Sequence, residues 1–207
     1  MNGKMADTAR IHGIAYNTTA LGPGNRAVIW FQGCKRSCKG CMSPGSRPLD
    51  GGTVWKVDDL LEKICSLNNI EGITISGGEP FLQVEALYMF LKNLRLKTDL
   101  GVIIYTGNTI EELKQMRDPM VDEIITDLAD IIIDGEYIDE LNDDCALKGS
   151  SNQVVNYISN RYKEYKNLYD RKDRSVQIVI EGKDALFIGV PTKETLSTWS
   201  KIVKEMK

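Results

Sequence analysis

The stretch Gly72-Ile-Thr-Ile-Ser-Gly-Gly-Glu-Pro80 predicts a buried strand that runs into a glycine-rich turn. β-Branched residues form the strand, and two consecutive glycines allow the backbone to approach other groups closely. A helical pattern follows, from about Leu82 to Arg95. Strand, turn and helix in this order indicate a βα unit, and the carboxyl end of such a strand is the usual place of a ligand in parallel α/β folds. We therefore expect a ligand site at this turn.

Short apolar runs alternate with amphipathic segments along the rest of the chain, which is typical of βα units around a parallel sheet. The expected strands cover residues 11–16 (at the sheet edge), 27–31, 72–76, 101–105, 129–133, 176–180 and 185–190. The expected helices cover residues 58–67, 82–95 and 193–205, and a short helix opens at Thr109, which forms a capping box with Glu112. The length favours a single domain over residues 1–207.

Charge and hydropathy argue against two classes of protein. The chain has 207 residues, with 26 Lys and Arg against 29 Asp and Glu, so its formal net charge is −3. A dedicated nucleic-acid binder usually has a strong basic excess, so we expect no nucleic-acid partner. The longest apolar run, residues 185–191, is too short to span a bilayer, and residues 1–10 carry no secretory signal. We expect a cytoplasmic protein without membrane association.

A single histidine, His12, limits the chemistry that side chains alone can perform. A catalytic Ser-His-Asp or Cys-His group would have to use it, and an HExxH metal site cannot form. Its position near the start of a strand favours a structural or surface role.

Tyrosines and basic residues alternate between residues 157 and 174, which raises the alternative of RNA stacking. However, Ile158, Tyr162, Tyr165 and Tyr169 follow the spacing of one helical face. We therefore expect a packed helix in this segment.

Three of the five cysteines fall within eight residues, in the segment Cys34-Lys-Arg-Ser-Cys38-Lys-Gly-Cys41. Spacings of four and three residues allow three thiolates from one loop to reach a common centre. The other two, Cys65 and Cys145, lie far away in the sequence, and Cys65 is expected on the buried face of its helix. An odd number of cysteines without a secretory signal argues against a disulfide framework.

The spacing of the cysteines leaves three interpretations open. A structural zinc site needs a fourth ligand, which would have to be Cys65 or Cys145. A redox pair of Cys38 and Cys41 leaves Cys34 unexplained. A 4Fe–4S cluster held by three thiolates leaves one iron open to a ligand, whereas such clusters normally have four cysteine ligands. The glycine-rich turn described above favours the open cluster.

The cysteine loop is also basic, because it carries Lys35, Arg36, Lys39 and Arg47 with no acidic residue among them. Such a loop offsets the negative charge of a thiolate-bound cluster or attracts an acidic partner. The alternative is that each of these side chains is simply solvated at the surface.

A CxxxCxxC loop followed roughly 35 residues later by a strand ending in Gly-Gly-Glu-Pro resembles the radical S-adenosylmethionine enzymes. The resemblance implies one 4Fe–4S cluster on Cys34, Cys38 and Cys41, with S-adenosylmethionine bound at the open iron. It implies reductive cleavage of S-adenosylmethionine to methionine and a 5′-deoxyadenosyl radical that abstracts hydrogen. It also implies a partial (β/α)6 barrel of mostly parallel strands with outer helices. The residues that would contact the methionyl amino group are Gly77, Gly78, Glu79 and Pro80.

Within that superfamily the chain resembles the small activating enzymes of glycyl radical enzymes, above all those of anaerobic ribonucleotide reductase. The similar segments are Trp30–Cys34, Cys38–Cys41, Tyr105–Thr109, Ile133–Gly135 and Gly149–Gln153. The implied reaction is the installation of a glycyl radical on a partner enzyme such as anaerobic ribonucleotide reductase. A flavodoxin or ferredoxin is the implied electron donor.

Further cofactor contacts are expected on the strength of this resemblance. Gly40 stands where many radical enzymes have an aromatic residue against adenine. Thr106, Gly107 and Asn108 follow a strand and contact the cofactor, unless they form only a tight turn. Asp134 ends an apolar strand and either contacts a ligand or cation or caps the turn.

The segment Met42–Ser46 differs from the Asn-containing segment of the activases and leaves the substrate open. One alternative is therefore a radical enzyme that acts on a small molecule or peptide, such as 7-carboxy-7-deazaguanine synthase. The segment Gly149–Gln153, of which residues 151–153 are expected at the cavity mouth, argues against that example. Another alternative is a non-catalytic zinc or iron–sulfur interaction module, which gives no reason for the Gly-Gly-Glu-Pro turn.

Overall fold

The computed structural model describes residues 7–169, 171–181 and 184–205. Its strands are β1 (Thr8–Thr18), β2 (Arg26–Phe31), β3 (Thr53–Lys56), β4 (Gly72–Gly77), β5 (Gly101–Tyr105), β6 (Ile131–Asp134), β7 (Val154–Tyr157), β8 (Val176–Glu181) and β9 (Asp184–Gly189). Its α-helices are α1 (Val57–Cys65), α2 (Val84–Lys97), α3 (Ile110–Gln115), α4 (Pro119–Glu123) and α5 (Lys193–Glu205). Short 3-10 helices cover Pro44–Ser46, Pro80–Gln83, Asp139–Leu141 and Lys163–Leu168, and a π-helical turn, Ile124–Leu128, follows α4.

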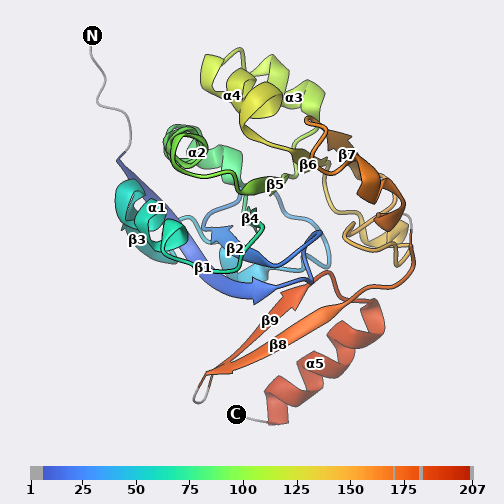
Figure 1. Cartoon of the computed structure of the whole chain (residues 1–207). Helices are drawn as coiled ribbons and strands as arrows, with labels where there is room; N and C mark the ends of the chain where they lie inside the picture. The colour runs from blue at the N-terminus through green and yellow to red at the C-terminus, as the bar shows by residue number, and fades with distance from the viewer. Residues whose placement is uncertain (1–6, 170, 182–183, 206–207) are drawn as a thin grey trace.

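Seven strands form one mixed sheet in the order β3-β1-β2-β4-β5-β6-β7 (Figure 1). Strands β2, β4, β5 and β6 are parallel, whereas β1, β3 and β7 pair antiparallel with their neighbours. The expected α/β fold with a mostly parallel central sheet is thereby confirmed. A six-unit (β/α) barrel is not confirmed, because the flanking pairs are antiparallel and the sheet does not close within the described residues.

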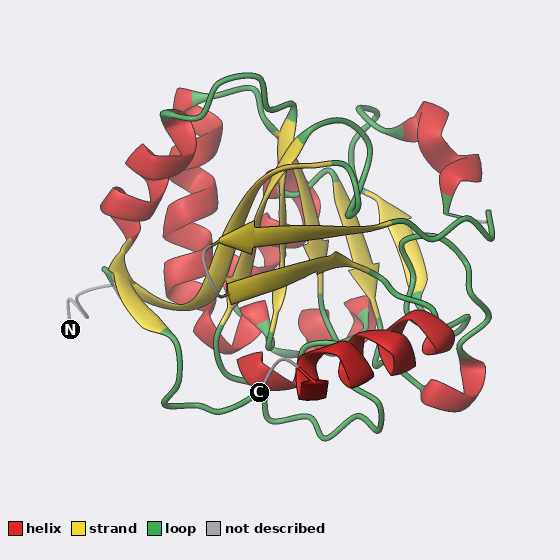
Figure 2. Ribbon diagram, turned by 90° about the horizontal axis from the view of Figure 1, so that it is seen from below, coloured by secondary structure: helices red, strands yellow, loops and turns green. Residues whose placement is uncertain are grey.

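The central strands are buried on both faces, as their continuous apolar sequences require. Helices α1, α2 and α4 lie on one face, where alternate residues of β2 such as Ile29 and Phe31 join the main core (Figure 1). The β8–β9 hairpin crosses the other face with α5 beside it (Figure 2). There Ile188 of β9 packs in one cluster with Val28 of β2 and Leu21.

Three strand expectations need correction. β1 is not an edge strand, because the unpredicted β3 pairs with its outer side from Thr8↔Lys56 to Ile11↔Thr53. β8 and β9 exist at residues close to those expected, but they form a separate two-stranded antiparallel sheet rather than part of the parallel one. Only two residues separate β8 from β9 in the sequence, which suits antiparallel pairing, whereas a parallel pair needs a long crossover.

The helix expected across residues 157–174 is wrong. The segment begins with the last residue of β7, which pairs with β6, and continues into a 3-10 helix, Lys163–Leu168. Tyr162 and Tyr169 are nevertheless buried, and Tyr165 is exposed. Tertiary contacts therefore decide the burial of these tyrosines, and their helical spacing is coincidental.

Cys65 is exposed, which contradicts the expectation that it faces the core. The buried residues of α1 are Val57, Leu60, Leu61 and Ile64, which follow helical spacing. Cys65 is the last residue of α1 and projects beyond this face. The capping box of Thr109 and Glu112 at the start of α3 is confirmed.

The buried Arg26 closes the end of the sheet where the parallel strands begin. It is fully buried at the start of β2, and Nε donates to Thr74 Oγ1 at 2.8 Å. The guanidinium also donates to Pro23 O, Ile73 O, Gly101 O and Tyr162 Oη. Every one of these partners belongs to the protein, so the buried Arg26 guanidinium is satisfied by protein groups.

The longest described helices are α2 and α5, of 14 and 13 residues. Both alternate apolar with charged residues. Within the described residues, no helix is long and apolar enough to span a membrane.

Candidate functional site

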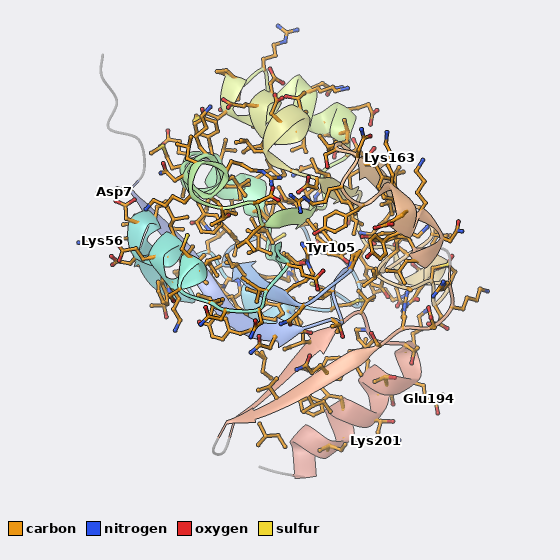
Figure 3. The ribbon with its side chains drawn as sticks, in the orientation of Figure 1. Asp7, Lys56, Tyr105, Lys163, Glu194 and Lys201 are labelled. Carbon is orange, nitrogen blue, oxygen red and sulfur yellow. The ribbon has the colours of Figure 1, made fainter. Side chains whose placement is uncertain are left out.

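A cavity of about 390 Å³ opens where the parallel strands end. The cysteine loop, the turns after β4 and β5, the segment after β6 and residues of β9 form its walls. Tyr105, the last residue of β5, lies near the centre of the molecule and also lines this cavity (Figure 3). Its hydroxyl donates to Leu147 O at 2.8 Å, which closes the cavity on that side. The strand ends thus carry a cavity at the place where the topology predicts a ligand site.

The backbone fixes the start of the cysteine loop directly after β2. Gly33 has a positive φ of 97°, which turns the chain out of the strand. Its N–H donates to Ser46 O at 2.7 Å, and the N–H of Cys34 donates to Arg47 O at 2.9 Å. The Gln32 side chain donates to carbonyls further along the same loop. The loop therefore folds back on itself and returns to the strand end.

All three predicted cysteines line the cavity as free thiols. Burial raises the pKa of Cys34, despite the opposing effect of a hydrogen bond from the Arg36 amide. Burial and a hydrogen bond to Glu136 raise the pKa of Cys38 to about 11. The charge of Cys41 acts in the same direction on both groups. The pocket thus disfavours the free thiolates of Cys34 and Cys38, which a bound metal would stabilise.

The donor set fits an iron–sulfur cluster. Three soft thiols of one loop face a cavity, and the Arg36 N–H donates to Cys34 Sγ at 3.4 Å, the type of contact that stabilises cluster sulfurs. No group of three or more His, Cys, Asp and Glu side chains in the described part of the chain is arranged to hold a metal ion. The three thiols are therefore not gathered as ligands of one ion.

The glycine-rich turn lies against the cysteine loop, as expected. Gly77 has a positive φ of 109°, and a Cβ there would lie 2.4 Å from Phe31 O. A Cβ on Gly78 would lie 2.2 Å from Gly33 O. The N–H groups of Gly78 and Glu79 donate to Phe31 O and Gly33 O, both at 2.8 Å. Glycine is required at both positions because the backbones of the two motifs are in direct contact.

Glu79 joins this turn to the end of β5. Its Oε1 accepts hydrogen bonds from Phe81 N at 3.0 Å and Thr106 Oγ1 at 2.8 Å, and its Oε2 accepts from Gly107 N at 2.9 Å. The residue is only 8% exposed. Burial raises the pKa of Glu79, although hydrogen bonds from Gly107 and Thr106 oppose this. Pro80 follows as the first residue of the 3-10 helix.

Some of the other residues predicted to contact the cofactor line the cavity, and others only hold the turns beside it. Thr106 and Gly107 line the cavity, whereas Asn108 bonds to Thr106 Oγ1 through its amide groups. Asp134 accepts the Ile110 N–H at 2.7 Å and so caps α3. Of residues 151–153, Gln153 lines the cavity.

Gly40 has a positive φ of 72° and lies against a side chain that sequence reasoning missed. A Cβ on Gly40 would lie 3.5 Å from the ring of Tyr137, which lines the cavity and donates to Asp139 Oδ1 at 2.8 Å. An aromatic side chain from another segment thus stands beside Gly40. No local pattern indicates this, because Tyr137 is almost a hundred residues away in the sequence.

The basic residues of the cysteine loop differ in their partners. Arg36 forms ion pairs with Glu112 and Glu136, and Lys39 pairs with Glu140 at 3.0 Å. Arg47 lines the cavity, and its buried Nε has no hydrogen-bond partner among the described residues. Arg36 and Lys39 are therefore neutralised by the protein, and Arg47 retains capacity for an anionic ligand.

Two further features of the cavity wall were not expected. Leu186, Phe187 and Val190, in or just after β9, line the cavity from a hairpin distant in sequence. His12 is exposed on β1, also lines the cavity, and has Nδ1 2.9 Å from Gln32 Oε1. Cys145 lies elsewhere, where its thiol donates to Asp143 Oδ2 at 3.2 Å.

Comparison with known proteins assigns this site to a family. The model of the 4Fe-4S single cluster domain matches residues 20–156, which include the cysteine loop, the glycine-rich turn and strands β2 to β6. The β8–β9 hairpin and α5 lie beyond this match. The chain therefore belongs to the 4Fe-4S single cluster domain family, within the radical S-adenosylmethionine superfamily.

The relatives define the branch of the superfamily. Over 145 residues, covering 66% of this chain and 91% of the relative, the chain is 27% identical to the anaerobic ribonucleoside-triphosphate reductase-activating protein of Salmonella typhimurium. The protein of the same name from Enterobacteria phage T4 is 27% identical over 64% of this chain and 83% of its own length.

A second type of activating enzyme is also similar. The pyruvate formate-lyase-activating enzyme of Listeria monocytogenes is 33% identical over 39% of this chain and 35% of its own length. The chain is thus an enzyme of the radical S-adenosylmethionine activase group with an iron–sulfur cluster. Membership in this group of enzymes argues against the alternative of a non-catalytic zinc or iron–sulfur interaction module.

Proposed function

We propose that the chain binds one 4Fe–4S cluster through Cys34, Cys38 and Cys41 and cleaves S-adenosylmethionine reductively. A cluster held by these thiols would supply the one-electron reduction of the sulfonium that cleaves S-adenosylmethionine to methionine and a 5′-deoxyadenosyl radical. The observation that carries the proposal is that the three thiols and the turn at Gly77–Glu79 line one cavity at the strand ends. The two motifs also contact each other through their backbones.

Glu79 has the capacity to bind the methionyl amino group while it supports the turn. An ionised carboxylate offers about four acceptor positions. Three are used by Phe81, Thr106 and Gly107, and the free position is on Oε2. Because Glu79 lines the cavity and is mostly buried, this free position would accept a hydrogen bond from the methionyl amino group.

The rest of the cavity supplies complementary groups for the same ligand. Arg47, with its unpartnered Nε, fits the methionyl carboxylate. Thr106 and Gly107 contribute to the wall beside Glu79. Gly40, Asn108 and Asp134 act indirectly, because each supports a loop or turn that borders the cavity.

We propose that the radical abstracts hydrogen from a glycine of a partner enzyme such as anaerobic ribonucleotide reductase, with flavodoxin or ferredoxin as electron donor. The names of the relatives support this substrate class. The proposal treats residues 1–207 as one domain, because β9 completes the cavity. The β9 residues of the cavity wall lie outside the family match, and together with the segment Met42–Ser46 they favour the alternative of a small-molecule or peptide substrate.

Anaerobic reconstitution with iron and sulfide, followed by S-adenosylmethionine and dithionite, tests the chemistry. We expect about four irons per chain and stoichiometric 5′-deoxyadenosine and methionine. Cys38→Ala abolishes both cluster and cleavage, whereas Cys65→Ala, which changes an exposed cysteine outside the loop, alters neither. A protein loaded with a 4Fe–4S cluster that forms no 5′-deoxyadenosine contradicts the proposal.

The substrate is tested by mixing the loaded protein with candidate glycyl radical enzymes. We expect a glycine-centred paramagnetic signal on one of them that depends on S-adenosylmethionine. Cleavage of S-adenosylmethionine without such a signal on any candidate would favour the small-molecule or peptide alternative.

A further inference from the structure

Arg36, two residues after Cys34, extends from the cysteine loop to the ends of two parallel strands. Its Nη2 lies 3.0 Å from Asn108 Oδ1 and 3.1 Å from Glu112 Oε2. Its Nη1 lies 3.3 Å from Glu136 Oε2. Asn108 follows β5, Glu112 is on α3, and Glu136 follows β6. One side chain thus connects the loop to three segments that are 72 to 100 residues away in the sequence.

These contacts differ in kind from those of the neighbouring Lys39. Lys39 pairs with Glu140 alone, and the two side chains are 80% and 65% exposed. Such a surface pair contributes little to the position of a loop. The side chain of Arg36 is only 25% exposed, and its planar guanidinium bonds to three acceptors at once. The N–H donors of a guanidinium point in fixed directions in one plane, so they hold their acceptors in a defined arrangement. A lysine ammonium has no such fixed geometry.

Arg36 also contacts both halves of the candidate site. A Cβ on Gly107 would lie 2.7 Å from Arg36 Cδ, so the arginine stem rests directly on the turn after β5. The N–H of the same Gly107 holds Glu79 Oε2 at 2.9 Å. At its other end, the Arg36 backbone N–H donates to Cys34 Sγ. The residue therefore lies between a predicted cluster ligand and the support of Glu79.

We propose that Arg36 is a positioning residue, which fixes the cysteine loop against the turn Thr106–Asn108. The inference rests on the proposed function, in which both the loop and Glu79 contact the same bound cofactor. With Arg36 in place, the thiols and Glu79 keep their relative position before the cofactor binds. Without it, the loop keeps its backbone bonds, the Cys38–Glu136 hydrogen bond and the exposed Lys39–Glu140 pair, but loses the bonds from Arg36 to Asn108 and Glu112.

Hydrogen–deuterium exchange of the cluster-free, reduced protein tests the positioning without any cofactor. In Arg36→Gln we expect peptides that cover residues 34–41 and 106–108 to exchange at least fivefold faster than in the wild type. Peptides from α1 should be unchanged. Lys39→Gln, which removes a neighbouring charge of the same loop, should exchange like the wild type, and Arg36→Lys should be intermediate.

The loaded protein provides the second readout. Arg36→Gln should require about tenfold more S-adenosylmethionine for the half-maximal change in the paramagnetic spectrum of the reduced cluster. Loss of iron from a variant that still folds, with faster exchange of the loop, also supports the proposal. If Arg36→Gln does not fold, the double variant Glu112→Gln/Glu136→Gln removes the anionic partners and keeps the side-chain shapes, and it should show the same faster exchange.

Exchange of the loop at wild-type rate in Arg36→Gln, or in the double variant where the single one does not fold, overturns the positioning role. The proposed function fails in a different experiment. A loaded wild type whose spectrum does not respond to S-adenosylmethionine contradicts cofactor binding, whereas the exchange result still reports whether Arg36 holds the loop.

Discussion

The two ends of the parallel sheet differ in how their buried polar side chains are hydrogen-bonded. Where the strands begin, Arg26 donates five hydrogen bonds to protein groups, and Asp130 accepts from Arg95, Val102 and Ser159. Where the strands end, three thiols face a cavity, and Arg47 has a buried Nε without a partner among the described residues. Arg26 and Asp130 are thus bonded to protein groups, whereas Arg47 has bonding capacity that a ligand would use.

Glycines serve both ends for different purposes. A Cβ on Gly101, at the start of β5, would lie 1.9 Å from Tyr162 Oη, so this glycine makes room for a side chain of the protein. A Cβ on Gly78, after β4, would meet backbone of the cysteine loop. At both positions the missing side chain makes room for another part of the protein. At Gly101 this is a buried side chain, and at Gly78 it is the backbone beside the cavity. Variants at the two ends should therefore separate stability from ligand binding.

The largest effect on stability is expected for Arg26→Met. Three buried carbonyls and two hydroxyls lose their donor, and unsatisfied buried groups are costly, so we expect a loss of about 4 kcal/mol in the free energy of unfolding. Urea denaturation of the cluster-free protein measures it. S-adenosylmethionine affinity of the folded, loaded fraction should not change. A variant as stable as the wild type would remove the contrast between the two ends.

Asp130→Asn comes next, with an expected loss of about 3 kcal/mol at pH 7, because it leaves the partly buried Arg95 without its anionic partner. Burial alone would raise the pKa of Asp130, but hydrogen bonds from Ser159, Arg95 and the Val102 amide lower it below its usual value. The ionised group therefore stabilises the fold fully above the unfolded-state pKa of about 4, and this contribution declines below that value and is lost as the pH falls through the lower pKa of the folded state.

Denaturation of the wild type and of Asp130→Asn between pH 7 and pH 3 checks this sign. The difference between the two proteins should shrink as the pH is lowered. If the difference in unfolding free energy stays constant with pH, the charge of the Asp130 carboxylate does not stabilise the fold.

Glu79→Gln should affect both properties, since this residue both supports the turn and faces the cavity. The amide NH2 replaces one acceptor oxygen, so either Gly107 or the Phe81–Thr106 pair loses a partner, at a cost of about 2 kcal/mol. The loaded variant should also bind S-adenosylmethionine at least tenfold more weakly. Denaturation and a titration of the cluster spectrum measure the two effects. A change in stability alone would assign Glu79 a purely structural role.

The smallest effect on stability is expected for Arg47→Met, within about 1 kcal/mol, because no protein hydrogen bond of Nε is lost. Affinity for S-adenosylmethionine should nevertheless fall about tenfold. Lys35→Met, an exposed residue of the same loop, is the matched control and should retain wild-type affinity. If both variants bind equally well, Arg47 does not face the ligand.

The local parts of this site could be predicted from the sequence. The spacing of Cys34, Cys38 and Cys41 and the turn after β4 are set by neighbouring residues, and the structure brings them to one cavity. The central strands were predicted for the same reason, since buried parallel strands have continuous apolar sequences. The capping box at Thr109 is likewise a local signal.

The parts that depend on distant partners could not be predicted. The basic loop gave no sign that Arg36 pairs with Glu112 and Glu136 rather than with solvent, because those residues come from other strand ends. The packing of β9 against the cavity could not be predicted either, since a continuous apolar run predicts a strand but not the surface on which it packs. Burial of Tyr162 followed from its contact with Arg26 and not from helical spacing.

The central claim is that the cavity at the ends of the parallel strands holds a cluster with one iron open to a ligand. Electron–nuclear double resonance tests it most directly. The reconstituted and reduced protein is examined with S-adenosylmethionine that carries 15N in its methionyl amino group. We predict a 15N hyperfine coupling of a directly bound nitrogen, which disappears with unlabelled cofactor. A fully loaded cluster that shows no such coupling, or shows a fourth protein ligand instead, would contradict the account.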